Sequence, residues 1–105
     1  MFGLLFNLKP IMGMDASSQL QIIAFWAPWC LPCLQLSPII HDITQRYMGR
    51  VLVIKINVEE QQITSEQYNI EELPTVIFLK EGRVVHRFSG TQSQGSVERL
   101  IHQFL

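Results

Sequence analysis

Cys30 and Cys33 are the residues of this chain best suited to chemistry, and only two residues separate them. A Cys-x-x-Cys pair can bind zinc, form a structural cross-link, or cycle between a dithiol and a disulfide. A structural zinc site is completed by a second such pair or by spaced histidines, and the sequence has neither. A cross-link that closes so short a loop adds little stability. Redox chemistry without a metal is therefore the favoured interpretation.

The residues on either side of the pair predict a strand before it and a helix after it. Residues 22–27 are almost all apolar, as in a strand covered on both faces. Apolar residues then recur at helical spacing on one face, at Leu36, Ile40, Ile43 and Tyr47. Pro32 suits the first turn of this helix.

This placement predicts different roles for the two cysteines. Cys30 would lie at the positive end of the helix dipole, which favours the thiolate and lowers the thiol pKa from ~8.5 toward neutrality. Cys33, one turn later, would point inward. We therefore expect an exposed Cys30 to attack and a buried Cys33 to resolve.

The rest of the chain alternates between predicted strands and helices. A second apolar run at 51–58 predicts another buried strand, with Lys55 as its one charge, and completes a strand–helix–strand unit with parallel strands. Ser96 is placed to cap the terminal helix. The further predicted elements are a strand at 4–8, an ambiguous segment at 12–20, a short helix at 61–68, a hairpin of strands 76–79 and 84–88, and a helix around 97–104. The expected fold class is α/β, with a central mixed β-sheet and helices on both faces, in a single domain over residues 1–105.

Composition limits the choice of partners and of cellular location. A net charge of −1 provides no attraction to nucleic acid or to an anionic membrane, so we expect neither as a partner. The apolar start of the chain, residues 1–10, raises the question of an export signal. It has no basic region before the apolar run and no Ala-x-Ala cleavage site, and it is far shorter than the ~20 residues of a membrane span. We interpret it as the first strand, and expect a cytoplasmic protein.

A longer set of residues surrounds the cysteine pair in a specific order. It comprises Phe25-Trp26-Ala27-x-Trp29-Cys30-x-Pro32-Cys33, then Pro38, Lys55, Leu73-Pro74-Thr75, Gly82 and Gly90. In these residues and their spacing the chain from position 22 to 105 resembles the thioredoxin family. The resemblance implies the thioredoxin fold, a redox-active Cys30–Cys33 disulfide, and reduction of protein disulfides by dithiol–disulfide exchange. It also implies that a thioredoxin reductase supplies the electrons, that no cofactor is bound, and that the protein is a monomer.

The resemblance further implies which residues contact the substrate and which tune the site. The Leu73–Pro74 bond should be cis and face the cysteines, in a loop that binds an extended substrate segment by strand addition. Gly90 would allow close approach of a substrate backbone, although any turn glycine would look the same. The implied substrate-binding residues are Trp29, Leu31, Pro32, Leu73, Pro74 and Gly90. The implied tuning residues are Ala24, Trp26, Pro38 and Lys55, of which Trp26 is first of all a packing residue, and Pro38 should kink the helix.

Three positions depart from the family pattern. Ala24 stands where the family carries a buried aspartate that helps to deprotonate the resolving thiol, so Cys33 should ionise less readily. Lys55 has thereby lost its ion-pair partner, and either extends to the surface or acts near Cys33. Leu31 replaces a glycine and Leu34 a common lysine; Leu34 either joins an apolar rim or packs inward.

Two other functions remain open from the sequence. A dedicated disulfide oxidant or isomerase would use the same pair with a less negative reduction potential. A non-catalytic binding module would use the fold as a rigid partner in an assembly, and would not need either cysteine.

Overall fold

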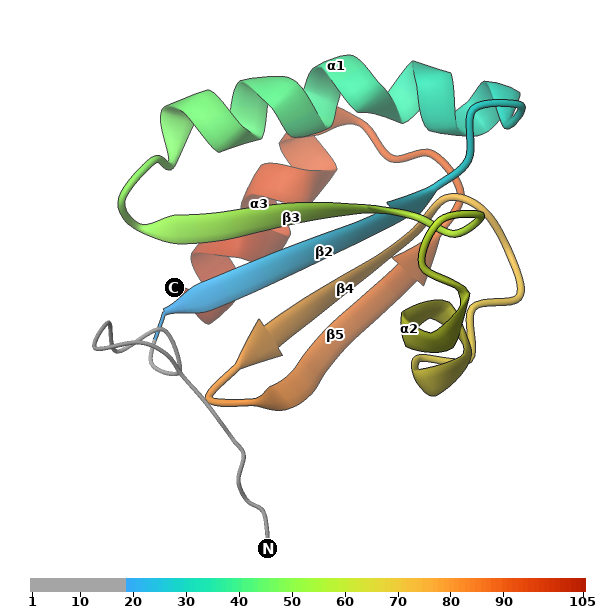
Figure 1. The fold of residues 1–105 in the computed structure, drawn as a ribbon. Coiled ribbons are helices and arrows are strands. Elements are labelled where there is room, and N and C mark those ends of the chain that lie inside the picture. The colour runs from blue at the N-terminus through green and yellow to red at the C-terminus, as the bar shows by residue number, and fades with distance from the viewer. Residues whose placement is uncertain (1–18) are drawn as a thin grey trace, which may run out of the picture.

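Strand β2 (Leu20–Trp26) lies at the centre of the sheet. The computed structural model describes residues 19–105, so the strand predicted at 4–8 and most of the segment at 12–20 lie outside the described residues. β2 pairs in parallel with β3 (Val51–Asn57) and antiparallel with β4 (Thr75–Lys80), which pairs antiparallel with β5 (Arg83–Ser89). The strand order β3-β2-β4-β5 makes a mixed sheet, as predicted (Figure 1).

Helices cover both faces of this sheet. Figure 1 shows α1 (Leu31–Arg46) and α3 (Gln94–Phe104) on one side and the short α2 (Gln62–Gln67) on the other. Alternate residues of β2 point to opposite faces, so one set packs against α1 and α3 and the other against the segment after α2. The first set is Leu20, Ile22 and Ala24, and the second is Ile23 and Phe25. The α/β fold class is confirmed.

Helix α1 presents the predicted apolar face to the sheet. Leu36, Ile40 and Ile43 are buried along it, and Tyr47 is buried at its C-terminal cap. Pro38 lies inside α1, and the helix continues past it. A kink at that position stays a prediction.

Two expectations about the elements are wrong. Strand β3 is not buried throughout: Val51 and Ile56 are buried, but Leu52 is exposed, because β3 lies at one end of the sheet formed by residues 19–105. Ser96 does not cap α3. The cap is Ser93, whose Oγ accepts the N–H of Ser96 at 3.1 Å. The first turn of α3 lacks the apolar residues that revealed the rest of the helix, so the periodicity placed its start too late.

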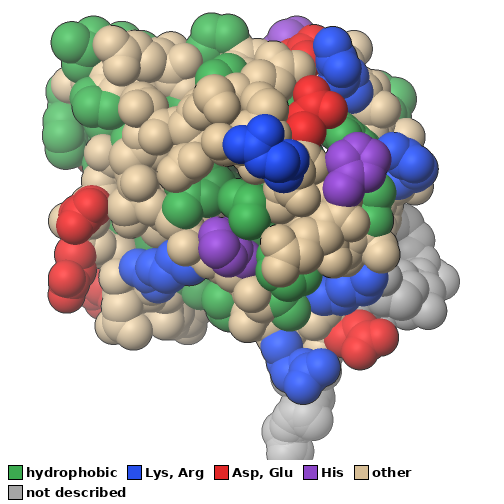
Figure 2. Space-filling model, turned by 180° about the vertical axis from the view of Figure 1, so that it is seen from behind, with side chains coloured by type: hydrophobic (Ala, Val, Ile, Leu, Met, Phe, Trp, Pro, Cys, Tyr) green, Lys and Arg blue, Asp and Glu red, His purple; other side chains and the backbone are tan. Residues whose placement is uncertain are grey.

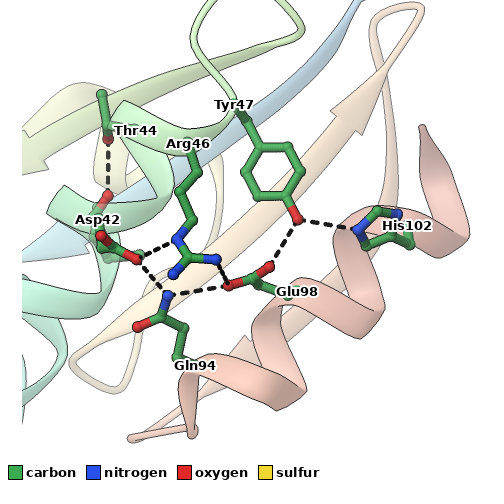
Figure 3. Close-up of polar contacts among 8 residues, drawn as sticks. Asp42, Thr44, Arg46, Tyr47, Gln94, Glu98 and His102 are labelled. Carbon is green, nitrogen blue, oxygen red and sulfur yellow. Dashed lines mark hydrogen bonds and ion pairs between the residues drawn. The ribbon is translucent and has the colours of Figure 1, made fainter.

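A polar network joins the C-terminal half of α1 to α3 (Figure 3). The Tyr47 hydroxyl donates to the Glu98 carboxylate at 2.9 Å and lies 3.1 Å from Nε2 of His102. Glu98 also accepts from Gln94 at 3.0 Å and pairs with Arg46 at 3.5 Å. These contacts hold the helix that begins at the cysteine pair against the C-terminal helix.

The network shifts the pKa values of two of its members. Hydrogen bonds from Gln94 and then Tyr47 lower the pKa of Glu98 below its ordinary value of 4.5. Burial, followed by the hydrogen bond to Glu98, raises the pKa of Tyr47. Because the unfolded chain binds a proton at Glu98 more readily, the stabilisation from this carboxylate is present above pH 4.5 and is lost as the pH falls through the lowered folded value.

We expect Glu98→Gln to flatten the acid side of the stability profile, because the amide cannot titrate. Urea unfolding between about pH 3 and about pH 7 would show a smaller loss of stability on acidification than in the wild type. Glu66→Gln, which removes an exposed carboxylate on α2, should keep the wild-type dependence. Parallel profiles for Glu98→Gln and the wild type would show that this carboxylate is not linked to folding.

Candidate active site

Cys30 and Cys33 form a disulfide at the N-terminus of α1. Cys30 is the N-cap residue with extended backbone, and its Sγ accepts the N–H of Cys33 at 3.3 Å. The N–H of Cys30 donates to the carbonyl of Ala27 at 3.2 Å, which closes the turn that leads out of β2. Pro32 lies in the first helical turn, where its missing N–H has no intrahelical partner to lose. The predicted placement of the pair between strand and helix is confirmed.

The two cysteines are equally buried, each with 5% of its surface exposed, so the expectation of an exposed Cys30 is wrong. Ala27 is buried with them in one cluster, against which Trp26, Val58 and Leu73 pack. The cysteines differ instead in the space that they line. Cys30 lines an open cleft of about 620 Å³, whereas Cys33 lines a separate cavity of about 170 Å³.

The cleft beside Cys30 brings together most of the residues expected to bind substrate. Trp29, Leu31, Pro32 and Leu73 all line it. The same cleft is lined by residues that the sequence did not single out, namely Val58, Ser65, Ile70 and Glu71. They come from the end of β3, from α2 and from the loop after α2. These segments are distant from the cysteines in the sequence and lie beside them only in the folded chain.

The loop around Pro74 lies next to this cleft. The Leu73–Pro74 peptide bond is cis, as the resemblance implied. Gly90 donates its N–H to the carbonyl of Pro74 at 2.9 Å and has a φ of 83°, a conformation that glycine adopts without strain. Pro74 lines the cavity of Cys33, whereas Gly90 lines neither space. Gly90 is therefore placed to hold the Pro74 loop.

Trp29 has a hydrogen-bond partner that sequence reasoning missed. Its indole Nε1–H donates to the carboxylate of Glu59, which follows the carboxyl end of β3. Because β2 and β3 are parallel, their carboxyl ends meet at the same edge of the sheet. From this rule the sequence could have predicted that Glu59, after β3, lies near Trp29, after β2.

Three exposed apolar side chains flank the cysteine pair, and we define them as the apolar rim. Trp29 and Leu31 line the cleft of Cys30, whereas Leu34 lines the cavity of Cys33. These side chains are 68%, 65% and 52% exposed. Figure 2 shows apolar side chains gathered at the upper left corner of the molecule, the end where β2 passes into α1. Of the two alternatives for Leu34, the structure places it in the rim.

The cavity behind Cys33 contains the departures expected to tune the site. Ala24 is opposite Lys55 in the pairing of β2 with β3, and both line the cavity. Lys55 is exposed, with Nζ 5.5 Å from the centre of the Trp26 ring. It thus reaches the surface and also borders the space that Cys33 lines. Pro38 lines neither this cavity nor the cleft.

Comparison with known proteins identifies the family. The thioredoxin family model matches residues 12–103. The chain belongs to the thioredoxin family. It is 34% identical to the thioredoxin of Synechocystis over 80% of this chain and 78% of that protein, and 31% identical to the thioredoxin of Bacillus subtilis over 87% and 88%. The crystal structure of the germline-specific thioredoxin Deadhead of Drosophila melanogaster matches with a TM-score of 0.79 and 24% identity, covering 86% of this chain and 85% of that one, which shows the shared fold.

Membership in this family establishes the class of reaction. Thioredoxins reduce protein disulfides through a Cys-x-x-Cys pair, and this chain has that pair at the start of α1, so it is a thiol–disulfide oxidoreductase, as predicted. Within residues 19–105, no group of three or more histidine, cysteine or acidic side chains is arranged to hold a metal ion. None of the helices described here is both long and apolar enough to span a membrane.

We expect Glu59→Ala to release the Trp29 ring, because the indole N–H then loses its acceptor. In ¹⁵N–¹H spectra the Trp29 side-chain N–H should shift and exchange faster with solvent, while that of Trp26 stays in place. Glu60→Ala, which removes the neighbouring exposed carboxylate, is the matched control. A Trp29 signal that does not respond to Glu59→Ala would argue against this hydrogen bond in solution.

Proposed function

We propose that Cys30 is the nucleophile and Cys33 the resolving residue in the reduction of protein disulfides. The observation that carries the proposal is the position of Cys30, an N-cap residue whose sulfur accepts a backbone N–H and which lines the open cleft. In the reduced protein, the same N–H and the positive end of α1 stabilise a thiolate there. Cys33 lines only the inner cavity, which suits a group that attacks within the protein.

The reaction balances in two exchanges. The Cys30 thiolate attacks one sulfur of the substrate disulfide; a bond forms between protein and substrate, and the other substrate sulfur leaves as a thiolate. Cys33 then loses its proton and attacks the Cys30 sulfur, which breaks the mixed disulfide and releases the second substrate thiolate. The substrate gains two electrons, and the protein is left with the Cys30–Cys33 disulfide seen in the structure.

The substrates in this proposal are proteins with accessible disulfides. An extended segment would lie in the cleft against the apolar rim and the loop held by Gly90, which makes Trp29, Leu31, Pro32, Leu73 and Pro74 its contact residues. A reductase of the thioredoxin reductase type would return the disulfide to the dithiol, so that the chain takes part in electron transport without a bound cofactor. We further propose a single-domain, monomeric, cytoplasmic protein without nucleic-acid or membrane partners.

We expect the wild type to accelerate the reduction of insulin by dithiothreitol, and Cys30→Ser to abolish the acceleration because the attacking sulfur is gone. Cys33→Ser should retain the first exchange and accumulate a mixed disulfide, detected as an adduct by mass spectrometry. A wild type no faster than Cys30→Ser would contradict the proposed reaction. An adduct on Cys33 in Cys30→Ser, and none on Cys30 in Cys33→Ser, would reverse the roles.

We expect Ala24→Asp to speed the resolving step at neutral pH, because a carboxylate in the cavity can accept the proton of Cys33. The gain should be about tenfold, less than a well-positioned general base provides, because Lys55 across the strand pair makes the carboxylate less basic. Stopped-flow measurement of decay of the mixed disulfide tests this, with Ala24→Asn as the uncharged control. Equal or slower resolution in Ala24→Asp than in Ala24→Asn would refute it.

A further inference from the structure

The cavity behind Cys33 is separate from the cleft that Cys30 lines. Residues of β2 and of one side of α1 line it, and the small side chain of Ala24 leaves space in its interior. Most of the side chains that face it are apolar, among them Ala24, Leu36, Ile40 and Pro74. Such a lining favours an aliphatic or aromatic group over water.

One charge lies at the edge of this apolar space. Of the described residues that line it, Lys55 is the one cationic side chain, and there is no carboxylate among them. The ion pairs found among residues 19–105 do not involve Lys55, whose ammonium group lies over the Trp26 ring at 5.5 Å. An anionic group bound at this edge would be attracted by Lys55 while remaining in contact with water.

The size of the cavity limits the ligand. Its volume of about 170 Å³ is close to the ~150 Å³ of an apolar protein cavity known to bind benzene. A chain of about four to six carbons is therefore the largest that it can enclose. A longer or branched acid would have to leave part of its apolar surface in water.

From this combination we propose that the cavity binds a short-chain aliphatic monocarboxylate. The hydrocarbon tail lies against Ala24, Leu36 and Ile40, and the carboxylate lies at the edge beside Lys55. The ligand is thereby placed on the inner side of the disulfide, next to Cys33, and leaves the cleft of Cys30 open. This inference does not depend on the proposed roles of the two cysteines in reduction.

The test is a titration of the oxidised, full-length ¹⁵N-labelled protein with sodium pentanoate at constant sodium concentration. We expect saturable shifts of the backbone amides of Ala24, Cys33 and Ile40. Acetate carries the charge without the chain, and pentan-1-ol carries the chain without the charge, so both should bind more weakly. Because binding to the oxidised protein is measured, the result is independent of any reductase activity.

Two variants separate the contributions of cavity and charge. Lys55→Gln should weaken pentanoate binding by about threefold or more, as expected for loss of a partly exposed ion pair, whereas Arg83→Gln, which removes a cation from the hairpin, should leave it unchanged. Ala24→Leu should abolish binding by filling the cavity. Should Ala24→Leu fail to fold, Lys55→Gln and the two probe compounds still decide the question.

Four results would overturn the proposal. The first is the absence of saturable shifts with pentanoate. The second is binding of pentan-1-ol as tight as that of pentanoate. The third is pentanoate binding that Lys55→Gln does not weaken. The fourth is a set of shifts that maps to residues away from the cavity.

Discussion

The pairing of β2 with strands on both of its sides is the constraint on which the rest of this structure depends. Because β2 pairs in parallel with β3 and antiparallel with β4, its backbone N–H and C=O groups have hydrogen-bond partners on both sides. Its side chains pack on both faces of the sheet. The chain leaves β2 at its carboxyl end, and α1 begins after a short turn. The turn between them places Cys30 at the N-cap, with its sulfur against the N–H of Cys33.

Two separate spaces adjoin the one disulfide. On the side of Cys30 lies an open cleft bordered by the exposed Trp29 and Leu31, suited to an extended partner segment. On the side of Cys33 lies an apolar cavity that ends at Ala24 and is bordered by Lys55. In the proposed reaction, the disulfide exchange typical of the family takes place at the cleft of Cys30. Of the positions that depart from the family pattern, Leu31 lines this cleft, whereas Ala24 and Leu34 line the cavity of Cys33.

Much of this could be predicted from the sequence, because the strongest signals are local. The apolar run of β2 and the helical spacing in α1 determined the order of elements and hence the position of the cysteine pair. The cis bond before Pro74 came from the family resemblance alone, because nothing in the local residues requires it. The start of α3 was placed too late, since a polar first turn capped by Ser93 carries no apolar periodicity.

Other features depend on contacts between distant segments and could not be predicted. Cys30 is buried in a cluster against which Val58 and Leu73 pack, and both of these residues lie far from it in the sequence. The bond between Trp29 and Glu59 requires the parallel alignment of β2 and β3. The exposure of Leu52 follows from the place of β3 in the sheet, which a continuous apolar run did not indicate.

The central claim is that the Cys30–Cys33 pair reduces other disulfides, and its reduction potential tests that claim most directly. The pair would be equilibrated with glutathione buffers of known ratio, and the fraction of free thiols measured by alkylation and mass spectrometry. The account predicts a potential near that of thioredoxin, about −270 mV, so that the dithiol is the electron donor. A potential near −120 mV, typical of a dedicated oxidant, would contradict it.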